Sequence, residues 1–499
     1  MISKSPYGDT FKYEIDDTFE REKIDAFLKK RKTVVVQGLG FVGSAMVAAL
    51  ALSRAQDGSL RYNVIGVDLP DEKNFWKIAR INNGVPPVRS FDKKMDEAYA
   101  QASQNKNVLA TYSPYAYSKA DVVVIDIHLD IKKKELGAPY EYEFSYDGFK
   151  TAIETVAQHI VEDTLVIIET TVPPGTTEQV VYPLCKEVFS RRGLDINKLY
   201  LAHSGERVMP GTNYLDSIVN FYRVYSGINS ESKIRAREFF ESFVNTRDFP
   251  ITEMHSPTAS EMVKVLENSY RAVNIAFIQE WTEFAEEADV NLFEVVKTIR
   301  KRPTHQNIMW PGFGVGGYCL TKDALLADWA YRNLFNKEEN LGMSLAAIGI
   351  NDLMPEFTFE LLQRELLDDL NGKYITILGV SYLNDVADTR SSPTQVFYEM
   401  CENRGGRLTV HDPLVSFWPE KQLEIDTDIK NLADKKHDIA VFAVRHHEYV
   451  TLSAKEIREI LPGVRIIIDA NNVLTDETAR ELAQAEIIVT GVGKGHWNL

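Results

Sequence analysis

One short segment constrains the fold of this chain more than any other. A β-branched run, TVVV at 33–36, leads into QGLGFVG at 37–43, and small residues suited to the start of a helix follow. A strand, a G-x-G-x-x-G turn and a helix in this order predict a dinucleotide-binding βαβ unit. Gly38 permits the tight turn, Gly40 lets a pyrophosphate approach the backbone, and Gly43 lets the helix pack closely on the strand.

The residues around this turn also predict which dinucleotide binds. Phe41 and Val42 open the helix, whose free N–H groups and positive dipole end suit phosphates. Asp68 ends the next β-branched run, NVIGVD. A carboxylate at this place accepts hydrogen bonds from a ribose 2′-OH and repels a 2′-phosphate. The sequence therefore predicts NAD as the cofactor rather than NADP.

Two sections rich in buried strands flank a helical section. ADVVVIDI and TLVIIETT follow the two runs above, and YITILGV, RLTVHD, HDIAVFAV and VRIIIDA return after residue 373. Continuous apolar runs that alternate with helical stretches are typical of parallel sheets covered on both faces. The predicted fold is α/β, with two Rossmann-like doubly wound parallel-sheet domains joined by a central helical domain.

The domain boundaries follow from these changes of pattern. We expect an N-terminal extension at 1–32, an NAD-binding domain at 33–250, a central helical domain at 251–355 and a C-terminal nucleotide-binding domain at 356–499. Within the extension, Phe19, Ile24 and Phe27 have helical spacing and predict one amphipathic helix that lies on the first domain.

The C-terminal section repeats the layout of the first. Gly379 and Asp412 end successive strand-like runs, as Gly38 and Asp68 do. The two sections are therefore predicted to be two versions of one nucleotide-binding layout. Only the first has the full glycine set.

Composition narrows the class of partner. Asp and Glu total 72 against 56 Lys and Arg, a formal charge of −16, which argues against nucleic acid because nonspecific affinity for it comes from surplus cations. Three scattered cysteines exclude a disulfide framework. No apolar run approaches the roughly 18 to 20 residues that span a bilayer, and no secretory signal opens the chain. We expect a cytoplasmic protein with no membrane partner.

Cys319 lies in a loop suited to ligand contact. Within PGFGVGGYCLTKD, four glycines precede it, and they cost chain entropy that a plain connector does not need. A thiol there, with Lys322 and Asp323 close in sequence, can act as an activated nucleophile. A buried inert thiol is the alternative, and it is the prediction for Cys185 and Cys401, which sit in apolar helical patterns.

Lys264 and Asn268 are four positions apart in SEMVKVLENSY and share one face of a helix. An ammonium beside an amide can polarise an alcohol or aldehyde oxygen, and a lysine can also carry a proton. The alternative is a solvated surface pair. Arg271 and Asn274 continue the polar stripe along the same helix, which favours the functional interpretation.

Two further motifs follow strand-like runs, ETTVPPGTT at 169–177 and HSGERVMPG at 203–211. The carboxyl ends of parallel strands place ligand loops. Glu206 is either a structural partner of Arg207 or a carboxylate that orients water, and the sequence leaves both open. The pair His446-His447 is predicted to be loop surface. No Cys, His or Asp cluster has metal-ligand spacing, so no metal is predicted.

These motifs together resemble one family, the nucleotide-sugar 6-dehydrogenases, which include UDP-glucose, GDP-mannose and UDP-N-acetylhexosamine dehydrogenases. The resemblance covers about residues 33–495 and rests on GLGFVG, ETTVPPGTT, HSGERVMPG, KVLENSYRAVNIAF, GFGVGGYCLTKD, LGVSYLNDVADTRSSP and VHDP in that order. It implies that a sugar C6 alcohol is oxidised by four electrons to the carboxylate, with two NAD used in sequence.

The resemblance also implies residue roles. Lys264 and Asn268 would act on the substrate oxygen in the first oxidation. Cys319 would add to the aldehyde, so that the second oxidation gives a thioester. Water oriented by Asp323 and Glu206 would then hydrolyse the thioester. The remaining assignments are Thr171 and Lys322 to NAD, and Arg207, Arg271, Phe313, Gly314, Gly316 and Arg390 to the substrate. The third domain would hold the nucleotide diphosphate, and the central helices would form a homodimer.

Three features depart from the family pattern. DIHLD at 126–130 replaces a proline and threonine turn and precedes an inserted-looking IKKKELGAPYEYEF, which puts the usual threonine contact to the cofactor in question. Leu383 stands in place of a lysine, which removes one phosphate or sugar contact. Gly205 stands where proline is common.

The substrate and two rival functions stay open. HSGERVMPG and GVGGYC favour the UDP-N-acetylhexosamine branch over the GDP-mannose branch. A two-electron β-hydroxyacid-type dehydrogenase shares the Rossmann domain and the Lys/Asn pair, but it needs neither Cys319 nor a third domain. A non-catalytic nucleotide-sugar binding protein would fit the altered 126–134 stretch and Leu383, but the retained Cys319 and Asp323 speak against it.

Overall fold

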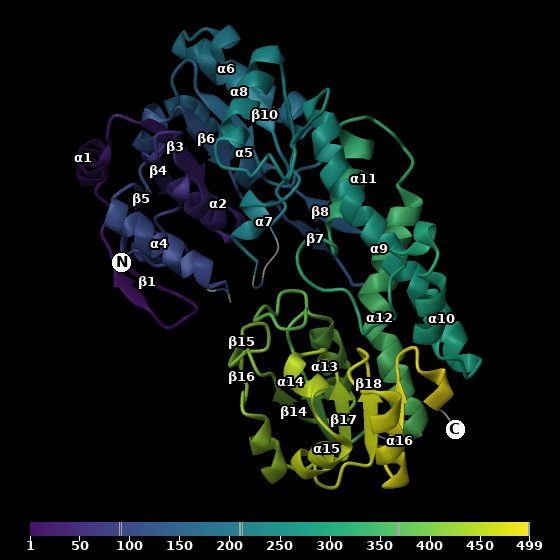
Figure 1. Ribbon diagram of the computed structural model, residues 1–499. Helices are drawn as coiled ribbons and strands as arrows, with labels where there is room; N and C mark the ends of the chain where they lie inside the picture. The colour runs from purple at the N-terminus through teal and green to yellow at the C-terminus, as the bar shows by residue number, and fades with distance from the viewer. Residues whose placement is uncertain (89, 91, 209–210, 212, 367–369, 498–499) are drawn as a thin grey trace. The chain divides into compact units, whose positions relative to one another are not determined.

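A computed structural model describes residues 1–88, 90, 92–208, 211, 213–366 and 370–497 of the chain (Figure 1). Contacts divide the chain into two compact units. Unit 1 contains residues 1–131, 144–266 and 329–338, and unit 2 contains residues 132–143, 267–328 and 339–499. Each unit is built around one parallel sheet.

The sheet of unit 1 has eight strands in the order β12-β11-β10-β9-β6-β3-β4-β5. Their bounds are β3 Lys32–Gln37, β4 Tyr62–Val67, β5 Val108–Thr111, β6 Val122–Ile125, β9 Leu165–Ile168, β10 Tyr200–His203, β11 Val224–Gly227 and β12 Thr252–Glu253. All pairs are parallel except β10 with β11. The strand order reverses between β3 and β6, which is where open α/β sheets bind ligands.

Helices cover both faces of this sheet, as its continuous apolar strands predict. Val34 and Val36 of β3 lie in one hydrophobic cluster and Val35 in the other, because successive side chains of a strand point to opposite faces. The helices of unit 1 are α2 Phe41–Leu52, α3 Phe75–Asn82, α4 Lys93–Asn105, α5 Asp147–His159, α6 Tyr182–Arg192, α7 Asp216–Val219 and α8 Ser230–Glu241.

The N-terminal extension forms a two-stranded hairpin and a helix: β1 Ile2–Lys4, β2 Thr10–Lys12 and α1 Asp17–Phe27. The predicted helix is confirmed, and Ile24 is fully buried against the sheet. Phe19 is 60% exposed and does not belong to the buried face. It sits in the first turn of α1, where its N–H is capped by the Asp16 carboxylate at 3.0 Å.

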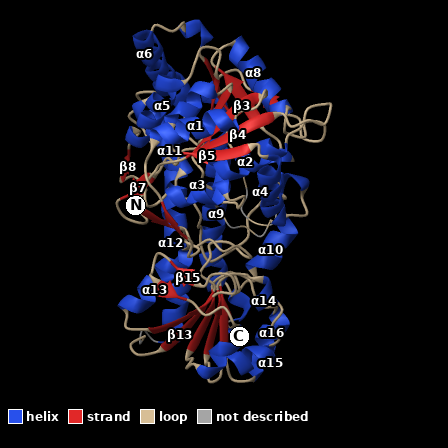
Figure 2. Cartoon of the chain, turned by 90° about the vertical axis from the view of Figure 1, so that its left-hand side faces the viewer, coloured by secondary structure: helices blue, strands red, loops and turns tan. Residues whose placement is uncertain are grey.

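The sheet of unit 2 has five parallel strands in the order β14-β13-β17-β18-β19. Figure 2 labels β13 among the red strands of this sheet. Their bounds are β13 Tyr374–Leu378, β14 Arg407–His411, β17 Ile439–Phe442, β18 Ile466–Asp469 and β19 Ile488–Gly491. Helices α12 Gly342–Leu366 and α13 Pro393–Asn403 cover one face, and α15 Ala454–Ile460 and α16 Asp476–Gln484 cover the other. The short α14 spans His447–Val450, and a small hairpin pairs β15 Phe417–Trp418 with β16 Leu423–Glu424.

The helical section contains α9 Pro257–Glu287, α10 Leu292–Ile299 and α11 Asp323–Asn333. The inserted-looking segment forms a hairpin, β7 Ile131–Lys133 and β8 Tyr142–Phe144. Within unit 2 this hairpin is tied to α12, because Lys133 Nζ lies 2.6 Å from an oxygen of Asp352. Two parallel-sheet units and a helical section confirm the predicted fold class.

Candidate functional site

The glycine turn between β3 and α2 leaves room for a ligand at one position. Gly38 has a φ of +93°, and a Cβ there would lie 2.2 Å from the Asp126 carbonyl oxygen. A Cβ at Gly43 would lie 1.8 Å from the Gly38 carbonyl oxygen. A Cβ at Gly40 would meet nothing within 4 Å. Gly38 and Gly43 are thus required by packing, whereas open space lies over Gly40, at the N-terminus of α2 that begins with Phe41 and Val42. This arrangement fits a pyrophosphate.

Asp68 lies directly after β4 and beside this turn. Its Oδ2 accepts the Leu39 N–H at 3.1 Å, and its Oδ1 accepts the Leu69 N–H at 2.8 Å. Lys77 of α3 holds the same carboxylate, with Nζ 3.0 Å from Oδ2. The acid is therefore fixed next to the glycine turn, as a ribose-binding carboxylate requires.

Glu206 and Lys264 form a buried ion pair in unit 1. Lys264 Nζ lies 2.8 Å from Glu206 Oε1 and donates to the Glu206 carbonyl oxygen at 2.9 Å. Burial alone would raise the pKa of Glu206, but the Lys264 ammonium and the Val208 N–H hold that pKa below its ordinary value. A Cβ at Gly205 would lie 3.2 Å from the Lys264 Cβ, so a glycine there leaves space for the lysine side chain.

A second buried cluster lies at the carboxyl ends of β6 and β9, and no motif in the sequence predicts it. Glu169 accepts a hydrogen bond from Arg223, and both residues are buried. No N–H or O–H group of the described residues donates to either oxygen of Asp126 or to Glu169 Oε2. The carboxyl groups of Asp126 and Glu169 are neighbours, and each shifts the pKa of the other. Two carboxyl groups can share a hydrogen bond only when one keeps its proton.

Burial has a large effect on this pair. It raises the pKa of Asp126 well above its ordinary value, and the neighbouring Glu169 charge adds to the effect. Burial also raises the pKa of Glu169, although Arg223 opposes the shift. The pair therefore holds one proton at pH values where a solvated aspartate is ionised.

Two other predicted site residues of unit 1 lie close in sequence to members of these two clusters. Thr171 follows β9 and is half-buried, and Arg207 follows Glu206 and is also half-buried. Burial lowers the pKa of Arg207. Met209 and Pro210 of the HSGERVMPG motif lie outside the described residues.

Cys319 belongs to a hydrogen-bonded turn in unit 2. Its carbonyl oxygen accepts the N–H groups of Lys322 at 3.2 Å and of Asp323 at 3.0 Å. Asn268 of α9 donates from Nδ2 to Asp323 Oδ2 at 2.6 Å, and Lys322 Nζ lies 3.2 Å from Asp323 Oδ1. The structure thus brings together Asn268, Lys322, Asp323 and the backbone of Cys319, which is half-exposed. Helix α9 carries Asn268 one turn beyond Lys264, as predicted.

The glycine loop before Cys319 packs tightly on the loop after β13. Cβ atoms at Gly316 and Gly317 would lie 2.5 Å and 2.7 Å from atoms of Tyr382, and Gly317 also has a φ of +77°. A Cβ at Gly314 would lie 2.5 Å from Pro393. These glycines therefore let two backbone segments meet. Phe313 is buried, with its ring centroid 5.7 Å from that of Phe397, so its side chain belongs to the core.

Arg390 is fixed by its own loop. Its Nε and Nη2 donate to the Asp388 carboxylate at 2.9 Å and 2.6 Å, and its carbonyl oxygen accepts the Gly317 N–H at 3.1 Å. Arg271 is exposed on α9. Leu383, which replaces the family lysine, is 44% exposed.

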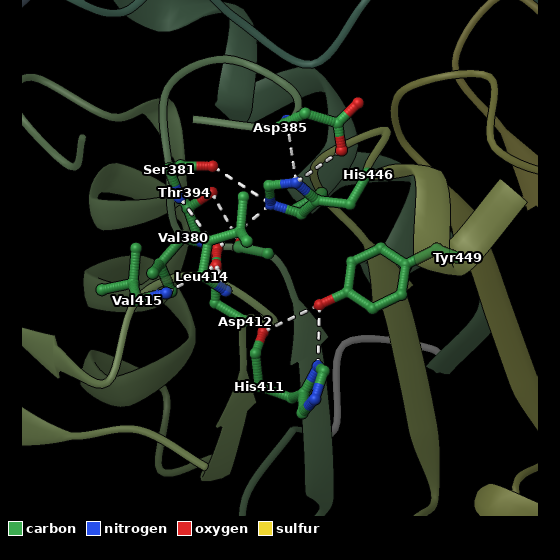
Figure 3. Close-up of polar contacts among 12 residues, drawn as sticks. Val380, Ser381, Asp385, Thr394, His411, Asp412, Leu414, Val415, His446 and Tyr449 are labelled. Carbon is green, nitrogen blue, oxygen red and sulfur yellow. Dashed lines mark hydrogen bonds and ion pairs between the residues drawn. The ribbon is translucent and has the colours of Figure 1, made fainter. Parts of the chain in front are cut away.

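The C-terminal unit repeats the turn of the first, as predicted. Gly379 has a φ of +101°, and Asp412 accepts the Val380 N–H at 2.8 Å, just as Asp68 accepts the Leu39 N–H. Asp412 is enclosed by further donors, including the Leu414 N–H at 2.9 Å and His446 Nε2 at 3.2 Å (Figure 3).

His446 is not loop surface, and that prediction is wrong for it. The side chain is fully buried. Its Nδ1 accepts the Asp385 N–H at 3.0 Å, so Nε2 carries the proton that faces Asp412 and Ser381. His446 therefore anchors the loop that carries Tyr382. His447 is exposed, as expected.

A cavity of about 750 Å³ opens in unit 2 at the carboxyl ends of β17 and β18. Two nearly parallel rings, Phe293 and Trp310, lie in its wall with centroids 6.0 Å apart. Its lining also includes the polar and basic side chains of Lys297, Arg445, Asn471, Asn472, Asp476 and Lys494. The sequence analysis named none of these residues. One feature of the sequence could have pointed to this cavity: Arg445 and Asn471 follow predicted strands.

Cys185 and Cys401 are buried, as expected, and burial raises the pKa of the Cys185 thiol to about 12. Within the described ranges, no group of three His, Cys, Asp or Glu side chains could hold a metal ion. None of the helices in the described part of the chain has the length and apolarity to cross a membrane.

Comparison with known proteins accounts for this combination. Residues 32–244 match the NAD-binding domain of the UDP-glucose/GDP-mannose dehydrogenase family, residues 258–352 match its central domain, and residues 376–476 match its UDP-binding domain. The chain belongs to this family. It is an NAD-dependent nucleotide-sugar dehydrogenase, an oxidoreductase, and the predicted family and cofactor are confirmed.

Several relatives match this dehydrogenase over nearly their whole length. UDP-N-acetyl-D-mannosamine dehydrogenase of Methanocaldococcus jannaschii is 30% identical over 93% of this chain and 97% of its own. UDP-glucose 6-dehydrogenase of Rickettsia conorii is 28% identical over 89% of this chain and 96% of its own.

The solved structure of an NDP-N-acetyl-D-galactosaminuronic acid dehydrogenase from Methanosarcina mazei superposes with a TM-score of 0.78 at 25% identity, covering 96% of this dehydrogenase and 99% of that chain. UDP-D-ManNAc dehydrogenase from Pyrococcus horikoshii gives a TM-score of 0.77 at 28% identity, with 93% and 100% covered.

Proposed function

We propose that this dehydrogenase oxidises the C6 hydroxyl of a UDP-sugar to the carboxylate, with Cys319 as the covalent nucleophile. The observation that carries the proposal is the Asn268–Asp323 hydrogen bond of 2.6 Å, which ties the turn of Cys319 to the helix that carries Lys264. The net reaction consumes the alcohol, two NAD⁺ and one water and releases the carboxylate, two NADH and three protons.

NAD supplies the hydride acceptor for both oxidations. Gly38 and Gly43 shape the turn, Gly40 would leave space for its pyrophosphate at the N-terminus of α2, and Asp68 would accept hydrogen bonds from its ribose. Thr171 and Lys322 are the further residues that we assign to the cofactor. The space over Gly40 and the fixed Asp68 carboxylate support this placement.

We assign the chemical steps to two groups of residues, one around Lys264 and one around Cys319. Lys264 and Asn268 donate hydrogen bonds to the C6 oxygen, and the ionised Glu206 holds the Lys264 ammonium in place. The Cys319 sulfur then forms a bond to the aldehyde carbon as the C=O π bond breaks, and the thiol proton passes to the former carbonyl oxygen, which gives a thiohemiacetal. After the second oxidation, water attacks the thioester, Asp323 or Glu206 accepts its proton, and the C–S bond breaks to return the thiol.

Most of the residues that we assign to the substrate belong to unit 2. The cavity at β17 and β18 offers flat aromatic walls for a base and the cations of Arg445 and Lys494 for phosphates. Arg207, Arg271 and Arg390 are the guanidinium groups that we assign to the substrate, and the loop with Gly314 and Gly316 borders the sugar. Relatives named UDP-N-acetyl-D-mannosamine dehydrogenase favour a UDP-N-acetylhexosamine over UDP-glucose.

Stoichiometry tests the reaction class. Purified protein is incubated with excess NAD and a limiting amount of each of several UDP- and GDP-sugars, and the NADH formed per sugar is counted. Two NADH per UDP-N-acetylhexosamine is the expected result. One NADH per sugar would identify the two-electron rival, and binding without NADH would identify a non-catalytic binding protein.

A matched pair of cysteine variants tests the nucleophile. Cys319→Ser should bind NAD normally but release carboxylate far more slowly than the wild type, because a serine hydroxyl is a far weaker nucleophile than a thiolate. Cys401→Ala, in the core of unit 2, should keep full turnover. Four-electron turnover by Cys319→Ser at the wild-type rate would remove Cys319 from the mechanism.

We also propose a homodimer through the central helices and a cytoplasmic location. Helix α9 exposes six large apolar side chains along its length, which a second copy would cover: Met262, Leu266, Tyr270, Phe277, Trp281 and Phe284. Light scattering of Phe284→Glu should give monomers where the wild type gives dimers. A reduced, nucleophilic thiol at Cys319 fits a reducing compartment.

A further inference from the structure

We propose that the N-terminal strap, residues 2–16, is a positioning element for NAD. It holds the loop and helix that follow β4 so that the Asp68 carboxylate is set before the cofactor binds. The strap precedes residue 32, where the match to the NAD-binding domain of the family begins. The inference rests on the proposed role of Asp68 as the ribose acceptor.

The hairpin of the strap is bonded to the segment that leads into α3. Ser3 is fully buried, and its hydroxyl donates to the Glu72 carbonyl oxygen at 2.7 Å. The same hydroxyl accepts the Trp76 N–H at 3.0 Å, in the first turn of α3. One serine therefore fixes the backbone on both sides of the start of α3.

Tyr13 fixes the loop between Asp68 and α3. Its hydroxyl donates to the Pro70 carbonyl oxygen at 3.2 Å. Its ring stacks on Phe75, with centroids 4.1 Å apart and planes 10° from parallel. Asp9 of the strap also pairs with Arg80 near the end of α3. The strap thus contacts the loop after β4 and both ends of the following helix.

The strap reaches the loop after β5 as well. The Tyr112 hydroxyl accepts the Asp16 N–H at 2.8 Å and donates to the Glu14 carbonyl oxygen at 3.3 Å. Strands β4 and β5 are neighbours in the sheet. The strap therefore holds two adjacent loops at the carboxyl edge of the sheet.

Helix α3 transmits this restraint to the cofactor site. Lys77 on α3 donates to the Asn74 side-chain oxygen at 2.6 Å and to Asp68 Oδ2 at 3.0 Å. Asp68 Oδ2 in turn accepts the Leu39 N–H of the glycine turn. The path therefore runs from the strap through α3 and Lys77 to Asp68. A carboxylate that is already held in place loses less conformational entropy when the ribose arrives, so binding is tighter.

The test is the double variant Ser3→Ala/Tyr13→Ala in the full chain, probed with NADH fluorescence. We expect the NADH dissociation constant and the KM for NAD to rise about tenfold, while the KM for the UDP-sugar and kcat at saturating NAD stay within about twofold. A residue that acts only on stability would not split the two KM values. Ile15→Ala, at a strap position that is 54% exposed, is the control and should match the wild type.

Further variants keep the proposal falsifiable. Tyr13→Phe keeps the ring stack and loses the hydrogen bond to Pro70, so its NADH dissociation constant should lie between those of the wild type and the double variant. If the double variant does not fold, the single variants Tyr13→Phe and Ser3→Ala take its place. An unchanged NADH dissociation constant in these variants would overturn the proposal. Asp68→Asn separates the two ideas: if it weakens NADH binding while the strap variants do not, only the role of the strap is wrong, and if it has no effect, the role of Asp68 is wrong.

Discussion

Replacing Asp126 by asparagine should make this dehydrogenase more stable at neutral pH. In the wild type, the Asp126 carboxyl oxygens are buried beside Glu169, and the two carboxyl groups can share a hydrogen bond only while the pair keeps a proton. An asparagine amide supplies an N–H donor to Glu169 at every pH, with nearly the same shape. The substitution therefore replaces a hydrogen bond that depends on a proton by one that does not.

The sign and size follow from linkage. Burial raises the pKa of Asp126 in the folded state, so the folded protein binds a proton that the unfolded chain has released above about pH 4. The stability contributed by this proton is fully present below that pH and is lost as pH rises towards the folded-state pKa. Within this window the contribution of the pair falls by about 1.4 kcal/mol for each pH unit, because the folded protein holds one proton more than the unfolded chain.

Urea denaturation without cofactor, at pH 4, 5, 6 and 7, measures the difference. The free energy of unfolding of Asp126→Asn, minus that of the wild type, should increase as pH rises from 4. Asp130→Asn is the control, because the Asp130 side chain is 62% exposed and should give the same curve as the wild type. A difference between Asp126→Asn and the wild type that stays constant across this range would show that the pair holds no extra proton.

Three other outcomes follow from the same structure. His203 is fully buried, and burial lowers its pKa to about 3. Its contribution to stability is therefore present above about pH 6.5 and is lost as pH falls, because only the unfolded chain then binds a proton there. In acid denaturation, the free energy of unfolding of His203→Gln should fall by about 1.4 kcal/mol less per pH unit than that of the wild type below about pH 6.5. Gly317→Ala would place a Cβ 2.7 Å from Tyr382 at a φ of +77°, so the KM for the UDP-sugar should rise and NADH affinity should not change. Glu206→Gln removes the carboxylate that holds Lys264 and should lower kcat by about 10²- to 10⁴-fold in steady-state assays, with NADH binding as the check that the site is intact.

Local patterns in the sequence determined the fold class and pointed to most of the candidate site residues. The apolar runs of β3, β4, β6 and β9 become buried parallel strands, because a run without polar alternation suits a strand covered on both faces. The glycine turn after β3 was equally readable, since a positive φ and a missing Cβ are properties of single residues. The same holds for the glycine loop before Cys319.

Only the tertiary structure decided which side chains meet. Asp126, Glu169 and Arg223 lie far apart along the chain, and they come together because β6 and β9 are neighbours in the sheet. His446 looked like surface because its neighbours are polar, yet the chain after β17 turns it inward onto Asp412. Charge and hydrogen-bond partners depend on strand order and loop path, which long-range packing sets, and no local spacing of residues records them.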